Sequence, residues 1–138
     1  MPDARMRRVP PATKGQMLWR GATLRCARCG QGKLFHRWFD IVDDCPGCGL
    51  HFEREPGYWA GALAINIGLV AAVFAVVLVI ALALTVPTVP VVEILVVLVP
   101  LMIVLPIVFY PFSKTIWLAV DRAFMQHLDP RERLDEQF

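Results

Sequence analysis

Residues 61–86 read GALAINIGLVAAVFAVVLVIALALTV and contain no ionisable side chain. A helix needs about 20 apolar residues to cross a hydrocarbon core of about 30 Å, so this run is long enough for one span. Two prolines in residues 85–90 then predict a tight reversal, and a second apolar run follows. The sequence therefore predicts an integral membrane α-helical hairpin, with transmembrane helices over residues 57–86 and 91–112.

The distribution of charge around the two runs predicts their orientation. All 14 Lys and Arg residues lie outside residues 57–112, and the reversal carries none of them while both flanks do. By the positive-inside rule, the N-terminus and the C-terminus both lie in the cytoplasm, and the chain is a multi-pass protein of the cell inner (plasma) membrane. The lipid bilayer is thus the first expected partner, whereas a formal net charge of +2 does not favour nucleic acid.

Three residues depart from the apolar pattern of the spans in an informative way. Pro100 and Pro106 lie inside the second span and predict a kinked helix. Asn66 is the one side-chain amide of the first span. Because an unbonded amide is unfavourable in lipid, we expect Asn66 to face protein and to bond, for example, a backbone carbonyl freed by a proline.

Small residues recur three or four positions apart along the first span, and such a stripe lets another helix approach closely. Its members are Gly57, Gly61, Ala64, Gly68, Ala72 and Ala75. The second span is the expected neighbour of this small-residue stripe. The alternatives are a second copy of the chain, which would give a homo-oligomer, or another membrane protein.

Four cysteines precede the first span in the pattern C-x2-C, fifteen residues, C-x2-C. This spacing is typical of a zinc site, because one tight turn aims two thiolates at an ion and the second pair completes the tetrahedron. Gly30 and Gly49 follow the two pairs directly and permit the positive φ that such turns adopt. We therefore predict one structural Zn2+ per chain, with the metal ligands Cys26, Cys29, Cys45 and Cys48.

Other interpretations of the cysteines are a redox-active dithiol, a disulfide pair and a nucleic-acid-binding ribbon. A thioredoxin-type site would need a βαβ context that the sequence lacks, and four thiolates leave no open position for a catalytic water. His36 or His51 could replace a ligand, but the set of four cysteines is already complete. The pattern therefore favours a structural metal site.

The cysteines define a zinc-ribbon head over residues 21–56. Alternating side chains predict a strand over residues 34–41, and a β-hairpin follows naturally from it. The aromatic side chains of Phe35, Trp38 and Phe39 could stack bases, but we expect them to cover the small core of the ribbon. Too few residues are present for a self-sufficient core, so metal binding should supply much of the folding energy of the head.

Three further segments flank the head and the spans. Residues 1–20 are interpreted as a flexible basic lead-in, and residues 129–138 as a charged tail. Residues 113–128 predict an amphipathic helix, which either lies in the membrane interface or extends the second span toward the ribbon. Its expected apolar face consists of Ile116, Trp117, Val120, Phe124 and Leu128.

The motifs around the cysteines and the start of the first span resemble a known family. They include Arg25-Cys26-x-x-Cys29-Gly30, Cys45-Pro46-x-Cys48-Gly49-Leu50, the run from Phe52 to Ala62, and Tyr110-Pro111-Phe112-Ser113-Lys114. With these motifs the chain resembles the bacterial membrane-protein family called domain of unknown function 983, over roughly residues 20–122. That family has no established activity. Some members are encoded near cytochrome oxidase assembly genes, which implies a role in the biogenesis of a respiratory complex.

The candidates for an active site are polar residues near the inner edge of the spans: Glu53, Glu55, Tyr58, Asn66, Tyr110, Ser113, Lys114 and Asp121. No recognised catalytic spacing joins them. We therefore expect a non-enzymatic interaction or assembly factor, with another membrane protein or a homo-oligomer as partner. The first alternative is an inner-leaflet enzyme or carrier for a lipid or small anion, acting through Lys114, Tyr110 and the pair Glu53 and Glu55. A zinc or redox sensor is the second alternative.

Overall fold

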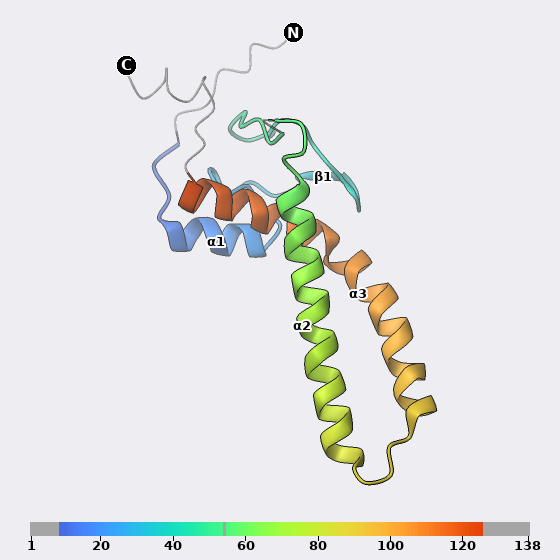
Figure 1. Cartoon of the computed structure of the whole chain (residues 1–138). Helices are drawn as coiled ribbons and strands as arrows, with labels where there is room; N and C mark the ends of the chain where they lie inside the picture. Colours follow the sequence, from blue (N-terminus) through green and yellow to red (C-terminus); the bar gives the residue numbers. More distant parts are fainter. Residues whose placement is uncertain (1–8, 54, 126–138) are drawn as a thin grey trace.

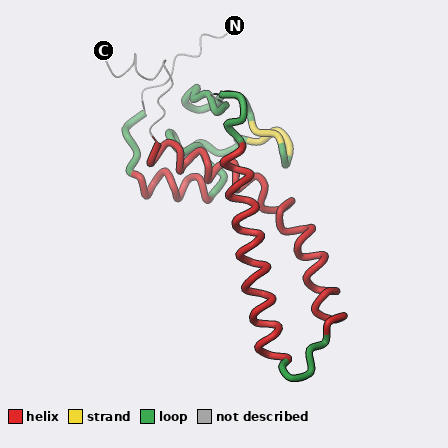
Figure 2. The backbone as a smooth tube through the Cα atoms, in the orientation of Figure 1, coloured by secondary structure: helices red, strands yellow, loops and turns green. Residues whose placement is uncertain are grey.

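The computed structural model describes residues 9–53 and 55–125. They form a long helical hairpin and a head that contains the cysteines (Figure 1). The elements in chain order are α1 (Lys14–Ala22), β1 (Phe35–Arg37), β2 (Asp40–Ile41), α2 (Ala60–Thr85), α3 (Val91–Val120) and the π-helical turn η1 (Asp121–Met125). The strands and most of the loops lie in the head (Figure 2). The predicted charged tail lies outside the described residues.

The two predicted apolar helices are confirmed by α2 and α3. They contain 26 and 30 residues, and both are long and apolar enough to cross a membrane. In the most apolar window of α2 none of the residues is buried in the protein, and in that of α3 only 6% are. The apolar side chains of a soluble core helix would be buried. The large apolar surface of these two helices therefore requires a partner or an apolar surrounding.

α3 bends at its prolines and continues beyond the predicted end of the second span. Pro100, Pro106 and Pro111 all lie inside the helix, and each removes one amide from its hydrogen-bond ladder. In its last turns, α3 crosses the head end of α2 and runs crosswise beneath the head (Figure 1). Of the two alternatives for residues 113–128, the described part thus extends the helix toward the ribbon.

The buried face of this crosswise end differs from the predicted apolar face. Ile116, Trp117 and Val120 are only half-buried, and Phe124 is exposed. The residues that are buried instead are Ser113, Lys114, Thr115, Leu118 and Ala119. The physical reason is that head and α1 close on this segment from two sides, and small or hydrogen-bonded side chains permit that approach.

The head contains a β-hairpin where the sequence predicted one strand over residues 34–41. β1 and β2 pair antiparallel, with Phe35 opposite Ile41 and Arg37 opposite Asp40. The turn falls at residues 38–39, which lack the glycine or asparagine of the common hairpin turns. Because the alternation of side chains continues through such a turn, the sequence pattern did not reveal the reversal. The exposed side chains of these two turn residues do not form part of the ribbon core, contrary to expectation.

α1 shows that part of the predicted flexible lead-in is helical. The Thr13 side chain accepts a bond from the Gln16 amide at 3.3 Å, and the Gln16 side chain accepts one from the Thr13 amide at 3.2 Å. At Gly21, a Cβ would lie 2.5 Å from the Ala119 Cβ and 2.8 Å from the Thr115 carbonyl oxygen. A helix of nine residues is marginal by itself in water. Packing on α3 therefore stabilises α1.

The small-residue stripe faces α3 only near the head. There Gly61 packs against the Trp117 ring, and Ala62 and Asn66 are buried. The other helical members of the stripe are exposed: Ala64, Gly68, Ala72 and Ala75. The prediction that the second span covers this stripe is therefore wrong for these four residues. α3 lies instead on the face of α2 that carries Asn66, whose amide donates to the Pro106 carbonyl oxygen at 3.0 Å.

Alanine at Gly61 should destabilise the hairpin, whereas alanine at Gly68 should not. A Cβ at Gly61 would overlap the Trp117 ring, and such overpacking costs ~1–3 kcal/mol. Among the described residues, nothing lies within 4 Å of a Cβ at Gly68, so Gly68→Ala gains up to ~1 kcal/mol of helix propensity. Thermal unfolding in detergent measures both effects. Equal Tm shifts in the two variants would contradict the close contact between α2 and Trp117.

Candidate metal centre

Each cysteine pair lies in a backbone turn of the same geometry. In the first turn, the Gly30 amide donates to the Cys26 carbonyl oxygen at 2.8 Å, and the Cys26 amide donates to the Gln31 carbonyl oxygen at 2.9 Å. The second turn repeats both bonds around Cys45 and Gly49 with the same distances. The φ angles of the two glycines are 76° and 72°, which confirms the positive φ predicted for them.

These two turns bring the four predicted ligands together. The four Sγ atoms all lie within 4.8 Å of one another, and the four cysteines are free. The Sγ atoms of Cys26 and Cys48 are 3.8 Å apart, and those of Cys29 and Cys45 are 3.6 Å apart. Four sulfurs at ~2.3 Å from one tetrahedral ion would lie ~3.8 Å from each other. The cluster therefore has the donor set and the spacing to hold a single metal ion.

The protonation of the cluster explains why it suits a cation. Hydrogen bonding with Cys26 lowers the pKa of Cys45 to about 2, whereas hydrogen bonding with Cys45 raises the pKa of Cys26 far above its usual range. One sulfur thus carries a negative charge that a neighbouring thiol stabilises as a proton donor. A divalent cation can take the place of the shared protons, because cysteine binds metal as the thiolate.

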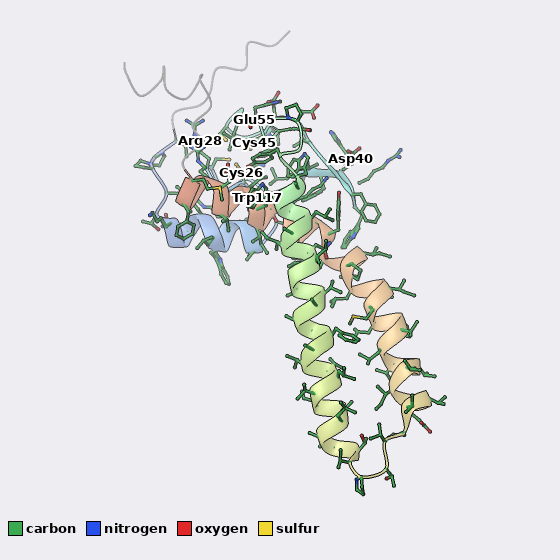
Figure 3. The ribbon with its side chains drawn as sticks, viewed as in Figure 1. Cys26, Arg28, Asp40, Cys45, Glu55 and Trp117 are labelled. Atoms are coloured by element: carbon green, nitrogen blue, oxygen red, sulfur yellow. The ribbon has the colours of Figure 1, made fainter. Side chains whose placement is uncertain are left out.

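The cluster lies in a small core that α3 helps to close. Three of its cysteines are buried, and their apolar neighbours in the head are Leu34, Leu50 and Phe52. Leu118 of α3 completes the same core. The labelled Cys26 and Cys45 lie next to the crosswise end of α3 (Figure 3). The cysteine head therefore packs directly on the second apolar helix.

The two histidines near the cysteines do not belong to this cluster. Among the described residues, the group of potential ligands at this place consists of the four cysteines alone. The His51 side chain is partly exposed, and its Nδ1 lies 2.8 Å from an Asp44 carboxylate oxygen. His36 is an exposed residue of β1. The geometry thus agrees with a complete set of four thiolates.

Arg20 of α1 supports the first cysteine turn, although the sequence predicted a flexible segment here. Its Nη1 donates to the carbonyl oxygens of Arg28 at 2.8 Å and Ala27 at 3.3 Å. These two residues stand between the first pair of cysteines. The signal that could have identified α1 is its capping box, in which Thr13 and Gln16 bond each other's backbone amides.

Two hydrogen bonds join the β-hairpin turn to α3, and we call them the ribbon clamp. The Trp38 Nε1 donates to the Ile107 carbonyl oxygen at 2.8 Å, and the Lys114 Nζ donates to the Phe39 carbonyl oxygen at 2.9 Å. In a regular helix, the Ile107 carbonyl would accept from residue 111, which is a proline without an amide hydrogen. The Trp38 indole therefore supplies the donor that Pro111 removes.

The polar candidates for an active site take part in contacts within the protein. Lys114 is only 8% exposed, and its Nζ lies 4.9 Å from the ring centre of Trp59 and 5.0 Å from that of Tyr110. Asp121 is 2% exposed and accepts a hydrogen bond from the Tyr58 hydroxyl at 3.0 Å. The structure thus places Lys114 with Tyr110 and Asp121 with Tyr58.

The remaining candidates lie elsewhere. Asn66 faces protein, as predicted, but it bonds the carbonyl of Pro106 rather than one that a proline has freed. The Ser113 hydroxyl donates to the Tyr110 carbonyl oxygen at 2.6 Å, within its own helix. Glu53 and Glu55 are exposed. The polar residues are therefore divided among local contacts and the exposed surface of the head.

A family model described as "Protein of unknown function (DUF983)" matches residues 35–121 of the chain. The match includes the second cysteine pair, the ribbon clamp and both long helices, and it begins after the first cysteine pair. No curated protein and no solved structure matches the chain. The family resemblance inferred from the sequence motifs is thereby confirmed.

Serine at Cys45 or Cys48 should abolish metal binding, because the hydroxyl is a poor substitute for a thiolate ligand. Elemental analysis of the purified full chain should find about one ion per chain in the unmodified protein and almost none in either variant. His51→Ala is the matched control and should retain the ion, since His51 bonds Asp44 instead of joining the cluster. Loss of metal from His51→Ala, or its retention in both serine variants, would refute the four-cysteine site.

Proposed function

This chain belongs to the family described as protein of unknown function (DUF983), and we propose that it is a membrane-anchored zinc-ribbon protein with a non-enzymatic interaction role. In this proposal zinc folds the ribbon, and α2 and α3 hold it at the cytoplasmic surface of the cell membrane. The ribbon and the hairpin together then present one surface to another membrane protein or complex. The ribbon clamp is the observation that carries the proposal, because it makes head and hairpin a single unit.

Zinc is the proposed metal because four thiolates in a tetrahedral arrangement suit Zn2+. Such a site has no open position for a substrate or a catalytic water, so its role is structural. In small zinc peptides, metal binding contributes ~10–16 kcal/mol at neutral pH. The buried core of the head is small, and it includes the cysteines themselves. Metal binding would therefore supply a large part of the folding energy of the head.

A bilayer is the proposed surrounding of α2 and α3 because it accounts for their exposed apolar surface. The reversal between them carries no Lys or Arg, whereas both flanks are basic, which supports a cytoplasmic location for both termini. An aromatic cluster supports a membrane–water boundary at the junction of head and hairpin, since Trp and Tyr side chains prefer such a boundary. The cluster lies where the long helices meet the head and includes Tyr58, Trp59, Tyr110 and Trp117.

An interaction role is favoured over catalysis by the position of Lys114, on which the enzyme alternative depends. Its ammonium group is buried, bonds the Phe39 carbonyl and lies against two aromatic rings. That arrangement uses the charge to fasten the ribbon and leaves little of the side chain for a substrate. The exposed part of the small-residue stripe supports a partner helix, either of another membrane protein or of a second copy: Ala64, Gly68, Ala72 and Ala75.

Reporter fusions test the proposed orientation. Green fluorescent protein fused after Phe138 should fluoresce, because it folds in the cytoplasm. Alkaline phosphatase inserted after Thr88, in the reversal, should be active because it would lie outside the membrane. The control is alkaline phosphatase fused after Phe138, which should be inactive. The opposite pattern of activities would contradict the proposed topology.

Alanine at Lys114 tests the interaction role against catalysis. Loss of the bond to Phe39 should loosen the ribbon, so the assemblies seen on native gels after mild extraction should shrink while zinc stays bound. Arg37→Ala is the matched control, because it removes an exposed charge from the same β-hairpin and should preserve the assemblies. Intact assemblies in Lys114→Ala, together with loss of the cellular function, would favour the enzyme or carrier alternative.

A further inference from the structure

α1 lies where the two long helices meet the head. α1 runs crosswise to α2 and lies alongside the crosswise end of α3 (Figure 1). Of the two sides of that end, α1 occupies the one from which the long helices extend. The close contact of Gly21 with Thr115 and Ala119 fixes this placement. If α2 and α3 cross a bilayer, the axis of α1 therefore lies roughly parallel to the bilayer surface and close to it.

The face of α1 turned away from α3 carries an exposed tryptophan. Gly21 packs on α3, whereas Trp19, two residues earlier and ~200° around the helix, is 72% exposed. Phe124 is also exposed beside α1, and the Lys14 Nζ lies 5.3 Å from the centre of its ring. Tryptophan has a large apolar body and a polar N–H tip, which suits the headgroup region of a membrane.

The segment that contains α1 is strongly basic. Between Asp3 and Asp40 the chain has no acidic residue. Nine basic residues lie in the same interval: Arg5, Arg7, Arg8, Lys14, Arg20, Arg25, Arg28, Lys33 and Arg37. Basic segments beside a membrane are attracted to the anionic lipids of the cytoplasmic leaflet. Both the charge and the exposed tryptophan thus select a lipid surface, rather than a second protein, as the occupant of this face.

We propose that α1 is a surface anchor, with Trp19 inserted among the lipid headgroups and basic residues of the same segment binding anionic phospholipid. This inference rests on the proposed insertion of α2 and α3. The anchor has a consequence for the metal centre, because Arg20 of the same helix bonds the carbonyls between Cys26 and Cys29. Lipid contact at α1 would therefore hold the first cysteine turn at a fixed height above the bilayer.

Fluorescence quenching of the full chain in lipid nanodiscs tests the anchor. The nanodiscs contain phosphatidylglycerol and phosphatidylcholine with brominated acyl chains, and the emission of Trp19 is obtained as the difference between the unmodified protein and Trp19→Phe. We expect this difference signal to be largely lost in the brominated bilayer and to resist aqueous acrylamide. Quenching by acrylamide but not by bromine would overturn the proposal, because Trp19 would then lie in water. Resistance to both quenchers would also overturn it, because protein would then cover Trp19.

The other tryptophans separate failure of the anchor from failure of the membrane proposal. In Trp19→Phe, the emission comes from Trp38, Trp59 and Trp117 near the membrane boundary. Bromine quenching of these three without quenching of Trp19 would refute only the anchor, whereas no bromine quenching at all would refute membrane insertion itself. Replacing phosphatidylglycerol with phosphatidylcholine should weaken the quenching of Trp19. Equal quenching in both bilayers would overturn the assignment of anionic lipid.

Discussion

Pro111 has no amide hydrogen, and the Ile107 carbonyl therefore lacks its usual donor within α3. An unpaired carbonyl is costly in an apolar surrounding. The Trp38 indole provides the missing donor at 2.8 Å, and the neighbouring Pro106 carbonyl accepts a bond from Asn66 of α2 at 3.0 Å. Two neighbouring carbonyls at one bend of α3 thus accept hydrogen bonds, one from the other long helix and one from the tip of the ribbon. The position of the head depends on this bend.

The same bend links the metal centre to the hairpin. It directs the end of α3 beneath the head, where Leu118 enters the core formed around the cysteines and Gly21 of α1 packs on Thr115 and Ala119. Metal binding would shape the two cysteine turns and so place the β-hairpin, whose turn reaches α3 through the ribbon clamp. Folding of the head and the bend of α3 should therefore stabilise each other, and such mutual support suits a rigid interaction surface better than a catalytic cleft.

Sequence patterns predicted those elements whose structure depends on residues close together in the sequence. The apolar runs identified α2 and α3, and the cysteine spacing with its glycines identified both cysteine turns. Contacts between distant segments were not predictable in this way. Trp38 was assigned to the ribbon core because nothing in its own neighbourhood indicates that its indole bonds a carbonyl 69 residues later. The capping box of α1 was a local signal, but the packing on α3 that stabilises this helix was not predictable. The outward-facing stripe was misassigned because the bend decides which face of α2 is covered.

Hydrogen–deuterium exchange with and without metal is the most direct test of the claim that ribbon and hairpin form one unit. The full chain would be studied in nanodiscs before and after the metal is removed with a chelator. The account predicts faster exchange after metal removal in the head and also in residues 107–119 of α3, because the Trp38 bond and the Leu118 contact would be lost together. Faster exchange confined to the cysteine turns, with α3 unchanged, would contradict it.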